Sequence, residues 1–323
     1  MNWQPTMDWE TAKARSSLIA KIRTFFYERE VVEVETPLMS QNTVTDVHMD
    51  VFETNYEQGN LALQNKTMYL QTSPEYAMKR LLAAGYGSIY QIAKAFRNEP
   101  HGRFHNPEFS MLEWYRLAFD HHQLMDEVAE LLKVTLNCSE VDKTTYQNVF
   151  LSTVSVDPLE ASTSVLKKCL ADYGIEGEWI TSEQDRDILL QVVFSEIIEP
   201  KIGTAKPVFV YDFPASQASL AKISEQDNRV AHRFECYFKG VELANGFNEL
   251  TSADEQLERF QKDNIQRNDL CKVSRDIDTY FMTALEHGLP NCSGVALGID
   301  RLVMLALDIS DIKKTLSFNV ENA

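Results

Sequence analysis

One segment of the sequence has residue types suited to holding a nucleotide phosphate. Alternation along a strand running from Ser88 to Glu99 places Ala93, Ala95 and Arg97 on the same face as Glu99. A guanidinium stays protonated and binds phosphate through two parallel hydrogen bonds, and the small alanines leave room for a ligand. The alternative is an Arg–Glu pair on a solvated sheet face.

The return strand, residues 108–116, carries aromatic and polar side chains in phase. Phe109, Met111, Glu113 and Tyr115 share one of its faces, and Phe109 suits stacking on a base. The intervening loop supplies further polar groups, namely Arg103, His105 and Asn106. The two strands and their loop therefore predict one side of a nucleotide pocket.

An acidic hairpin is the second candidate. Glu235, Glu242 and Glu249 lie around it, and carboxylates are ligands that Mg²⁺ accepts together with water and substrate phosphates. A solvated acidic surface is the alternative. Glu242 and Asn245 are out of phase for a regular strand, so both can face a site only if a bulge occurs near residues 244–246.

The third candidate is the run from Gly294 to Arg301. Its glycines permit close approach of a ligand to the backbone, and Arg301 lies where a helix is expected to begin, a favourable place for a terminal phosphate. By itself this pattern also fits an ordinary strand–helix turn.

The elements that position these residues follow from hydrophobic periodicity and turn residues. They are a helix over Thr11–Arg29 with Leu18, Ile22, Phe25 and Phe26 on one face, an extended run Val31–Pro37, a helix from Ser73-Pro74-Glu75 to Gly85, a mostly helical acidic stretch over about 120–206, a hairpin Phe234–Leu250 turning near Gly240, and a strand passing into a helix over Gly294–Leu307. We expect an α+β fold around an antiparallel sheet, with residues 1–323 forming a single domain.

Composition limits the classes of partner. The 323 residues include 31 Lys and Arg against 48 Asp and Glu, a net charge of −17 that disfavours general nucleic-acid binding and would attract a basic protein. The sequence has no membrane-span or signal-peptide pattern, and its five cysteines are scattered without a metal-type spacing. We expect a cytoplasmic protein.

Taken together, the segments resemble the motifs of class II aminoacyl-tRNA synthetases. Phe96-Arg97-x-Glu99 followed by His105-x-x-x-Phe109 resembles motif 2, and Gly298-x-Asp300-Arg301 resembles motif 3. Val34-Glu35-Thr36-Pro37, after a long helix, resembles motif 1, whose proline lies at the dimer interface. The resemblance covers nearly the whole chain and implies an antiparallel β-sheet flanked by helices, a homodimer, and activation of an amino acid as an adenylate with ATP and Mg²⁺.

Residues 103–113 and 242–250 are similar to the lysyl-tRNA synthetase versions of these motifs. The resemblance implies catalytic roles for Arg97 on the α-phosphate and Arg301 on the γ-phosphate. It assigns to ATP binding Arg97, Asn98, Glu99, His105, Asn106, Phe109, Glu242, Leu243, Gly298 and Arg301; to amino-acid binding Ser73, Pro74, Glu75, Tyr115, Asn245, Phe247, Glu249 and Ala296; and to magnesium Glu235 and Glu242. Glu75 would receive the α-side amine, and Glu249 with Tyr115 the side-chain amine.

The sequence departs from the synthetases in three ways. The motif 1 helix begins within about the first ten residues, so no N-terminal anticodon-binding barrel is expected, and tRNA is a doubtful acceptor. Ser73 stands where the synthetases usually have Ala, and Ala296 where they have Gly. A one-methyl change shifts discrimination by about 1–3 kcal/mol.

With these departures, the sequence resembles a group of truncated lysyl-tRNA synthetase paralogues, the elongation factor P (R)-β-lysine ligases. That resemblance implies transfer of activated (R)-β-lysine to a lysine ε-amine of elongation factor P. The alternatives are a truncated enzyme that activates α-lysine, an inactive regulatory homologue, and an asparagine synthetase of the same fold. The intact charged motif residues count against the second, and the amine-binding character of Glu75 and Glu249 counts against the third.

Overall fold

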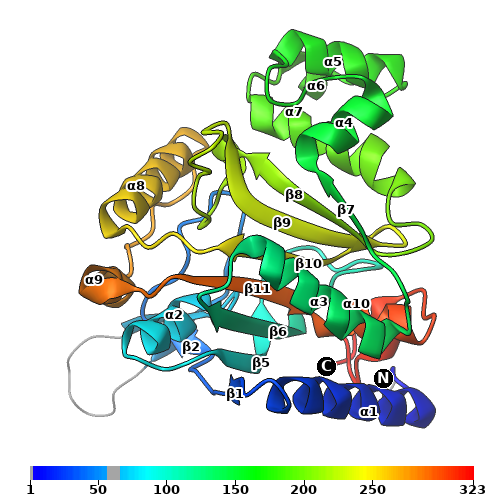
Figure 1. Cartoon of the computed structure of the whole chain (residues 1–323), viewed down its shortest axis with the longest axis vertical. Helices are drawn as coiled ribbons and strands as arrows, with labels where there is room; N and C mark the ends of the chain where they lie inside the picture. The colour runs from blue at the N-terminus through cyan, green and yellow to red at the C-terminus, as the bar shows by residue number, and fades with distance from the viewer. Residues whose placement is uncertain (1–2, 57–65) are drawn as a thin grey trace. The chain divides into compact units, whose positions relative to one another are not determined.

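The structure is a computed structural model that describes residues 3–56 and 66–323, shown in Figure 1. The chain forms two compact units. Unit 1 comprises residues 1–118 and 250–323, and unit 2 comprises residues 119–249. The expectation of one domain over residues 1–323 stays a prediction.

Unit 1 combines helices with two groups of hydrogen-bonded strands. Its elements are α1 (Trp9–Tyr27), β1 (Val32–Glu33), β2 (Met39–Ser40), β3 (Glu53–Tyr56), β4 (Lys66–Leu70), α2 (Glu75–Ala83), β5 (Ile89–Phe96), β6 (Glu108–Leu117), α8 (Ala253–Asp269), α9 (Thr279–Gly288), β11 (Cys292–Gly298), α10 (Ile299–Ala306) and the 3₁₀ turn η4 (Ile312–Thr315). The main strands follow the order β1-β5-β6-β11, and a small sheet has the order β2-β4-β3.

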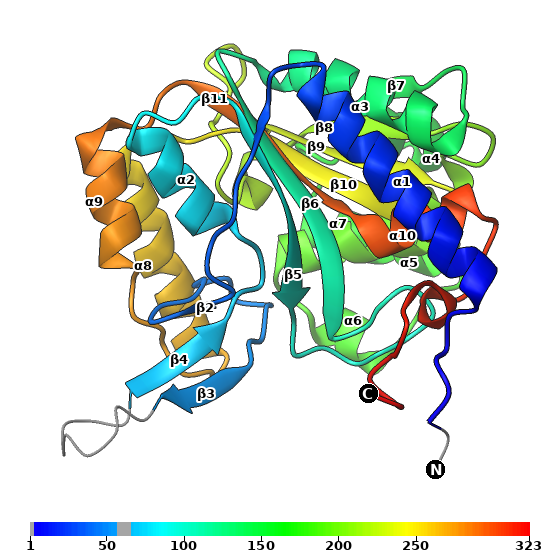
Figure 2. The ribbon, with the colours of Figure 1, turned by 90° about the horizontal axis from the view of Figure 1, so that it is seen from below.

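Helix α1 lies against the main strands of unit 1 (Figure 2). Asp8 caps the helix by accepting from the Thr11 N–H, which satisfies one of the backbone donors left open at a helix start. The expected apolar face is the buried one. Phe26 at its end stacks on Tyr90 of β5 with 4.4 Å between ring centroids and meets Trp114 of β6 edge-on. The predicted helix and its core-facing residues are therefore confirmed.

Unit 2 contains the helical stretch and the acidic hairpin. Its elements are α3 (His121–Leu136), β7 (Asp142–Thr145), α4 (Tyr146–Val154), α5 (Thr163–Asp172), α6 (Glu178–Ser182), α7 (Arg186–Val193), the π-turn η1 (Phe194–Ile198), the 3₁₀ turns η2 (Glu199–Lys201) and η3 (Ala215–Gln217), β8 (Val208–Pro214), β9 (Val230–Phe238) and β10 (Val241–Asn248). Helices α4 to α7 gather together in Figure 1 around an apolar cluster that includes Phe150, Leu166, Leu190 and Ile198.

Most strand pairs are antiparallel, as expected, and the pairs at two edges are parallel. β1 pairs with β5 in parallel in unit 1, and β7 pairs with β8 in parallel in unit 2. Long connections containing helices precede the second strand of each pair, and such connections are what parallel pairing requires. The fold is therefore mixed α+β. Among the described residues, no helix has the length and apolar character needed to cross a membrane.

The turn of the acidic hairpin lies where the sequence predicts it. Lys239 and Gly240 both have positive φ, 51° and 71°, between β9 and β10. Such turns match the right-handed twist of the flanking strands, and glycine reaches this conformation without steric cost.

Candidate functional site

A buried carboxylate with two hydroxyl donors connects residues of unit 1 that the resemblance assigned to the amino acid. Ser73 Oγ donates to Glu113 Oε2 at 2.6 Å, and Tyr115 Oη donates to Glu113 Oε1 at the same distance. Glu113 is 2% exposed and Tyr115 is also 2% exposed. Both carboxylate oxygens thus accept short bonds from residues that the sequence assigned to the amino acid.

Burial raises the pKa of Glu113 to about 7, and the neighbouring Glu75 charge adds to the rise, while the Ser73 and Tyr115 hydroxyls act against it. The sequence placed Glu113 on the correct face of its strand but gave it no role. The signal was present, since an acidic residue alternates in phase with Phe109 and Tyr115 on a strand that is otherwise largely buried. Glu113 is therefore a candidate site residue that the sequence prediction missed.

Glu75 begins helix α2 and is tied to the same network. Its backbone N–H donates to Ser73 Oγ at 3.1 Å, and Pro74 occupies the cap position, one residue later than the sequence suggested. Glu75 Oε1 also accepts from Lys79 Nζ at 2.6 Å, and Lys79 is 1% exposed. An amine ligand of Glu75 would share this carboxylate with the chain's own ammonium. Lys79 was not predicted, although Glu and Lys four residues apart on a helix commonly pair.

Strand register brings Ala296 beside this carboxylate. Ala296 on β11 is the Cα partner of Glu113 on β6, so both side chains lie on one face of the pair. Ser73 and Ala296, the positions that depart from the synthetase pattern, are thus both neighbours of Glu113.

Arg97 and Phe109, which the sequence placed on neighbouring strands of one pocket, lie in contact. The Arg97 guanidinium lies over the Phe109 ring, 5.3 Å from its centroid, and Ala95 pairs with Phe109 across the strands. Arg97 Nε is buried and meets no hydrogen-bond partner among the described residues. A buried guanidinium nitrogen fits a phosphate-binding role better than the solvated Arg–Glu alternative.

The strand that precedes this site is shorter than predicted. β5 ends at Phe96, so Arg97, Asn98 and Glu99 follow the strand and do not continue its alternation. Arg97 makes one further backbone bond, donating to Pro107 O at 2.9 Å. The two prolines of the loop, Pro100 and Pro107, have no N–H to extend the ladder, which explains the early end.

Arg301 lies in the first turn of α10, just after Gly298, as predicted. Its Nε donates to Phe104 O at 3.2 Å, and its Nη2 lies 2.7 Å from His105 Nε2. Because a guanidinium has no acceptor atom, His105 Nε2 must be the acceptor. Asn106 holds the same loop by donating to Glu108 O and accepting from Val320 N–H. The loop residues therefore orient Arg301.

Asp300, beside Arg301, has a buried structural contact. Its Oδ1 lies 2.7 Å from Arg15 Nη1 of α1, and its Oδ2 accepts from Ser110 N–H at 2.7 Å. Burial raises the pKa of Asp300, and the Arg15 charge opposes that rise. This pair anchors the start of α10, and hence Arg301, to α1 and β6.

In unit 2 the acidic hairpin has the bulge that the prediction required, but earlier in the strand. The register shift lies between Glu242 and Ala244, so Leu243 is the extra residue. On either side of it, Glu242 opposes Tyr237 and Asn245 opposes Glu235. The bulge therefore puts Glu235, Glu242 and Asn245 on one face.

Glu235 is 8% exposed and Glu249 is 1% exposed, so these two residues are not part of a solvated acidic surface. Glu235 accepts from Arg233 and from Tyr237. Burial raises the pKa of Glu235; the Arg233 charge opposes the rise, and the Glu242 charge adds to it. The Glu235 and Glu242 carboxylates repel one another on one face of the hairpin. Such a pair fits a site completed by a cation, and its oxygen atoms suit Mg²⁺.

Arg233 is a residue that the sequence prediction did not include. Its Nε donates to Asn245 Oδ1 at 3.3 Å and its Nη1 to Gln217 O at 2.8 Å, in addition to the bond to Glu235. The i, i+2 spacing from Glu235 was the available signal.

The remaining assigned residues differ in exposure. Phe247 packs on a small alanine cluster and is partly buried. The backbone of Glu249 forms an isolated antiparallel β-bridge with Ala221. The Leu243 side chain is 2% exposed, so its part in ATP binding would fall to its backbone.

Comparison with known proteins agrees with these features. A family model described as tRNA synthetases class II (D, K and N) matches residues 5–322. The chain is 54% identical over 317 residues to an elongation factor P–(R)-β-lysine ligase of Vibrio parahaemolyticus, covering 98% of each chain. It is 52% identical over 322 residues to the ligase of that name from Yersinia enterocolitica, covering all of this chain and 98% of the relative. The chain therefore belongs to the class II tRNA synthetase family of the aspartate, lysine and asparagine type, and within it to the group of the elongation factor P–(R)-β-lysine ligases.

Proposed function

We propose that this chain uses ATP to activate (R)-β-lysine as an aminoacyl-adenylate and transfers the β-lysyl group to a lysine side chain of elongation factor P. The observation that carries the proposal is identity above half, over 98% or more of this chain, with relatives that bear that ligase name. The carboxylate of Glu113, with donors from Ser73 and Tyr115, supports recognition of an amine.

In the first step a carboxylate oxygen of the amino acid attacks the α-phosphorus, an O–P bond forms, and pyrophosphate leaves. Arg97 would stabilise charge on the α-phosphate while Phe109 stacks on the base, and Arg301 would hold the terminal phosphate. Because no covalent enzyme intermediate is needed, catalysis rests on positioning and on charge stabilisation. In the second step a lysine ε-amine attacks the adenylate carbonyl carbon, AMP leaves, and the nitrogen loses a proton.

Glu235 and Glu242 would hold magnesium, which when bound neutralises charge on the phosphates. For Glu235 to bind a metal, its contact with Arg233 would have to be shared or released. Asn245 is the strand partner of Glu235, and its side chain accepts a hydrogen bond from Arg233, so it would help to position that arginine.

We further propose a homodimer that uses the motif 1 region. Val32, Leu38 and Met39 are exposed apolar residues in this segment, 60%, 38% and 38% exposed. Exposed apolar side chains of this kind would be covered by association. We also propose a cytoplasmic location. The acceptor would be a protein rather than a tRNA, because the net charge of −17 disfavours a phosphate-rich partner.

ATP–pyrophosphate exchange with (R)-β-lysine and with α-lysine tests the first step. We expect clear preference for the β form; preference for the α form would replace the proposal with the truncated lysine-activating enzyme. Incubation with ATP, β-lysine and elongation factor P, followed by intact-mass measurement, tests the second step. An acceptor of unchanged mass, together with active exchange, would refute the proposed acceptor alone.

A further inference from the structure

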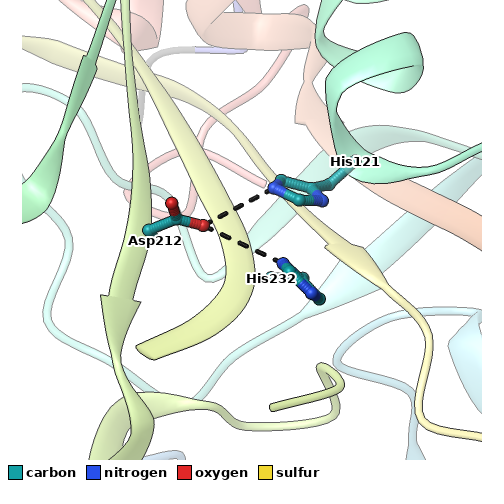
Figure 3. A group of neighbouring side chains, drawn as sticks. All are labelled: His121, Asp212 and His232. Carbon is teal, nitrogen blue, oxygen red and sulfur yellow. Dashed lines mark ion pairs between the residues drawn. The ribbon is translucent and has the colours of Figure 1, made fainter. Parts of the chain in front are cut away.

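Three potential metal ligands converge in unit 2, and none of them is among the residues assigned to the reaction. His121 is the first residue of α3, Asp212 lies on β8 and His232 lies on β9. Figure 3 shows the Asp212 carboxylate turned toward both imidazole rings. One ligand atom from each residue lies within 4.8 Å of those of the other two.

The backbone at Asp212 is specialised. The register of β8 against β9 shifts between Tyr211 and Phe213, so that Asp212 alone stands opposite two residues of β9, His232 and Arg233. Its φ is 57°, in the left-handed region, where a residue other than glycine costs about 1–3 kcal/mol. Bulges re-aim side chains, and this one accompanies the Asp212 orientation seen in Figure 3.

The imidazole nitrogens of the cluster are buried without ordinary partners. His121 is 3% exposed, and both of its ring nitrogens, together with Nδ1 of His232, have no hydrogen-bond partner among the described residues. Each buried polar atom left without a hydrogen bond costs about 1–3 kcal/mol. The cluster therefore has nitrogen lone pairs or N–H groups whose hydrogen-bonding capacity the chain itself does not use.

The spacing within the cluster is longer than that of hydrogen-bonded ion pairs. His121 Nε2 lies 3.5 Å from Asp212 Oδ1, and His232 Nδ1 lies 3.9 Å from the same oxygen. Charge-assisted N–H···O bonds are shorter, about 2.7–2.9 Å. Tetrahedral coordination with bonds of about 2.0–2.2 Å has ligand–ligand edges of about 3.3–3.6 Å. The 3.5 Å separation lies in this range, and the 3.9 Å separation is slightly longer than it.

We propose that His121, Asp212 and His232 bind a first-row divalent transition metal ion, with zinc as the probe and water at the remaining position. Imidazole with carboxylate is a donor set that zinc uses, whereas Mg²⁺ prefers oxygen ligands alone. The Asp212 and His232 side chains are 26% and 23% exposed, so solvent reaches the site. The ion would join the start of α3 to β8 and β9, and its binding would add to the stability of unit 2.

Zinc binding to the whole chain tests the proposal. Chelator-treated protein in buffer with excess Mg²⁺ is titrated with zinc, and bound metal is measured by elemental analysis and thermal unfolding in parallel. We expect about one zinc per chain and a higher Tm in the wild type. Asp212→Asn and His232→Gln should each weaken zinc binding by more than the ~10–100-fold that loss of an outer-shell partner costs.

Matched controls remove an imidazole or a thiol elsewhere. His287→Gln and Cys271→Ser, both at exposed positions, should bind zinc as the wild type does. Cobalt substitution gives a second readout, because a tetrahedral site produces visible absorption that Asp212→Asn should abolish even if its Tm is unchanged. Equal zinc binding and equal cobalt spectra in wild type and Asp212→Asn would overturn the proposal and leave a His–Asp ion pair.

Discussion

Ser73→Ala is a sharp test of the amine-binding site, because it removes a single oxygen atom from the Glu113 network. The lost bond is 2.6 Å long and joins a hydroxyl to a buried carboxylate. Hydrogen bonds to charged groups contribute about 1.5–3 kcal/mol. At about 1.4 kcal/mol per pKa unit, the pKa of Glu113 should rise by about 1–2 units from its value of about 7.

The rise lowers the ionised fraction at working pH. At pH 8 the wild-type Glu113 would be about nine-tenths ionised, and the variant between about one-tenth and one-half. If the carboxylate must be charged to bind an ammonium, kcat/KM for the amino acid should fall about 2-fold to 10-fold at pH 8. The acidic limb of the kcat/KM profile, which reports groups of the free enzyme, should move up by about 1–2 pH units.

The assay is ATP–pyrophosphate exchange with (R)-β-lysine from pH 6 to pH 9.5. Ser216→Ala is the matched control, since it removes a 2.8 Å serine-to-carboxylate bond, to Asp187, in unit 2. The control should keep the wild-type profile. An acidic limb that does not move in Ser73→Ala would refute the assignment of Glu113 as the titrating amine-binding group.

Further predictions follow from the same contacts. Burial holds the folded-state pKa of Glu113 above the ordinary 4.5, so the stabilising contribution of this group is present at low pH and is lost as pH rises through about 7. Urea unfolding from pH 5 to pH 8 should therefore show a smaller loss of stability in Glu113→Gln than in the wild type. Arg301→Ala should lower the exchange rate by about 10²–10³-fold with an unchanged Tm, and equal rates would show that the phosphate end of the site is misplaced. Arg15→Met leaves Asp300 buried without its cation, so urea unfolding should show a loss of about 3–5 kcal/mol, and a loss below about 1 kcal/mol would contradict the anchoring role.

Features that depend on neighbouring residues were readable from the sequence. The apolar spacing of α1 selects the buried face that contains Phe25 and Phe26, because side chains three and four apart share one side of a helix. The turn at Gly240 follows from the conformational freedom of glycine. Arg97 and Phe109 were predicted to line one pocket because they flank one connection between neighbouring strands, and the two side chains do lie together.

Other features depend on contacts between distant positions, and the tertiary structure alone decided them. Ser73 and Glu113 are 40 positions apart, and Arg15 and Asp300 are brought together from opposite ends of unit 1. The raised pKa of Glu113 results from burial and a neighbouring charge, neither of which periodicity measures. The His121–Asp212–His232 cluster likewise needs a helix start, a bulge and a strand to meet. Local patterns therefore determined the elements and motifs of this protein, whereas long-range packing set the charge and environment of the residues that carry its chemistry.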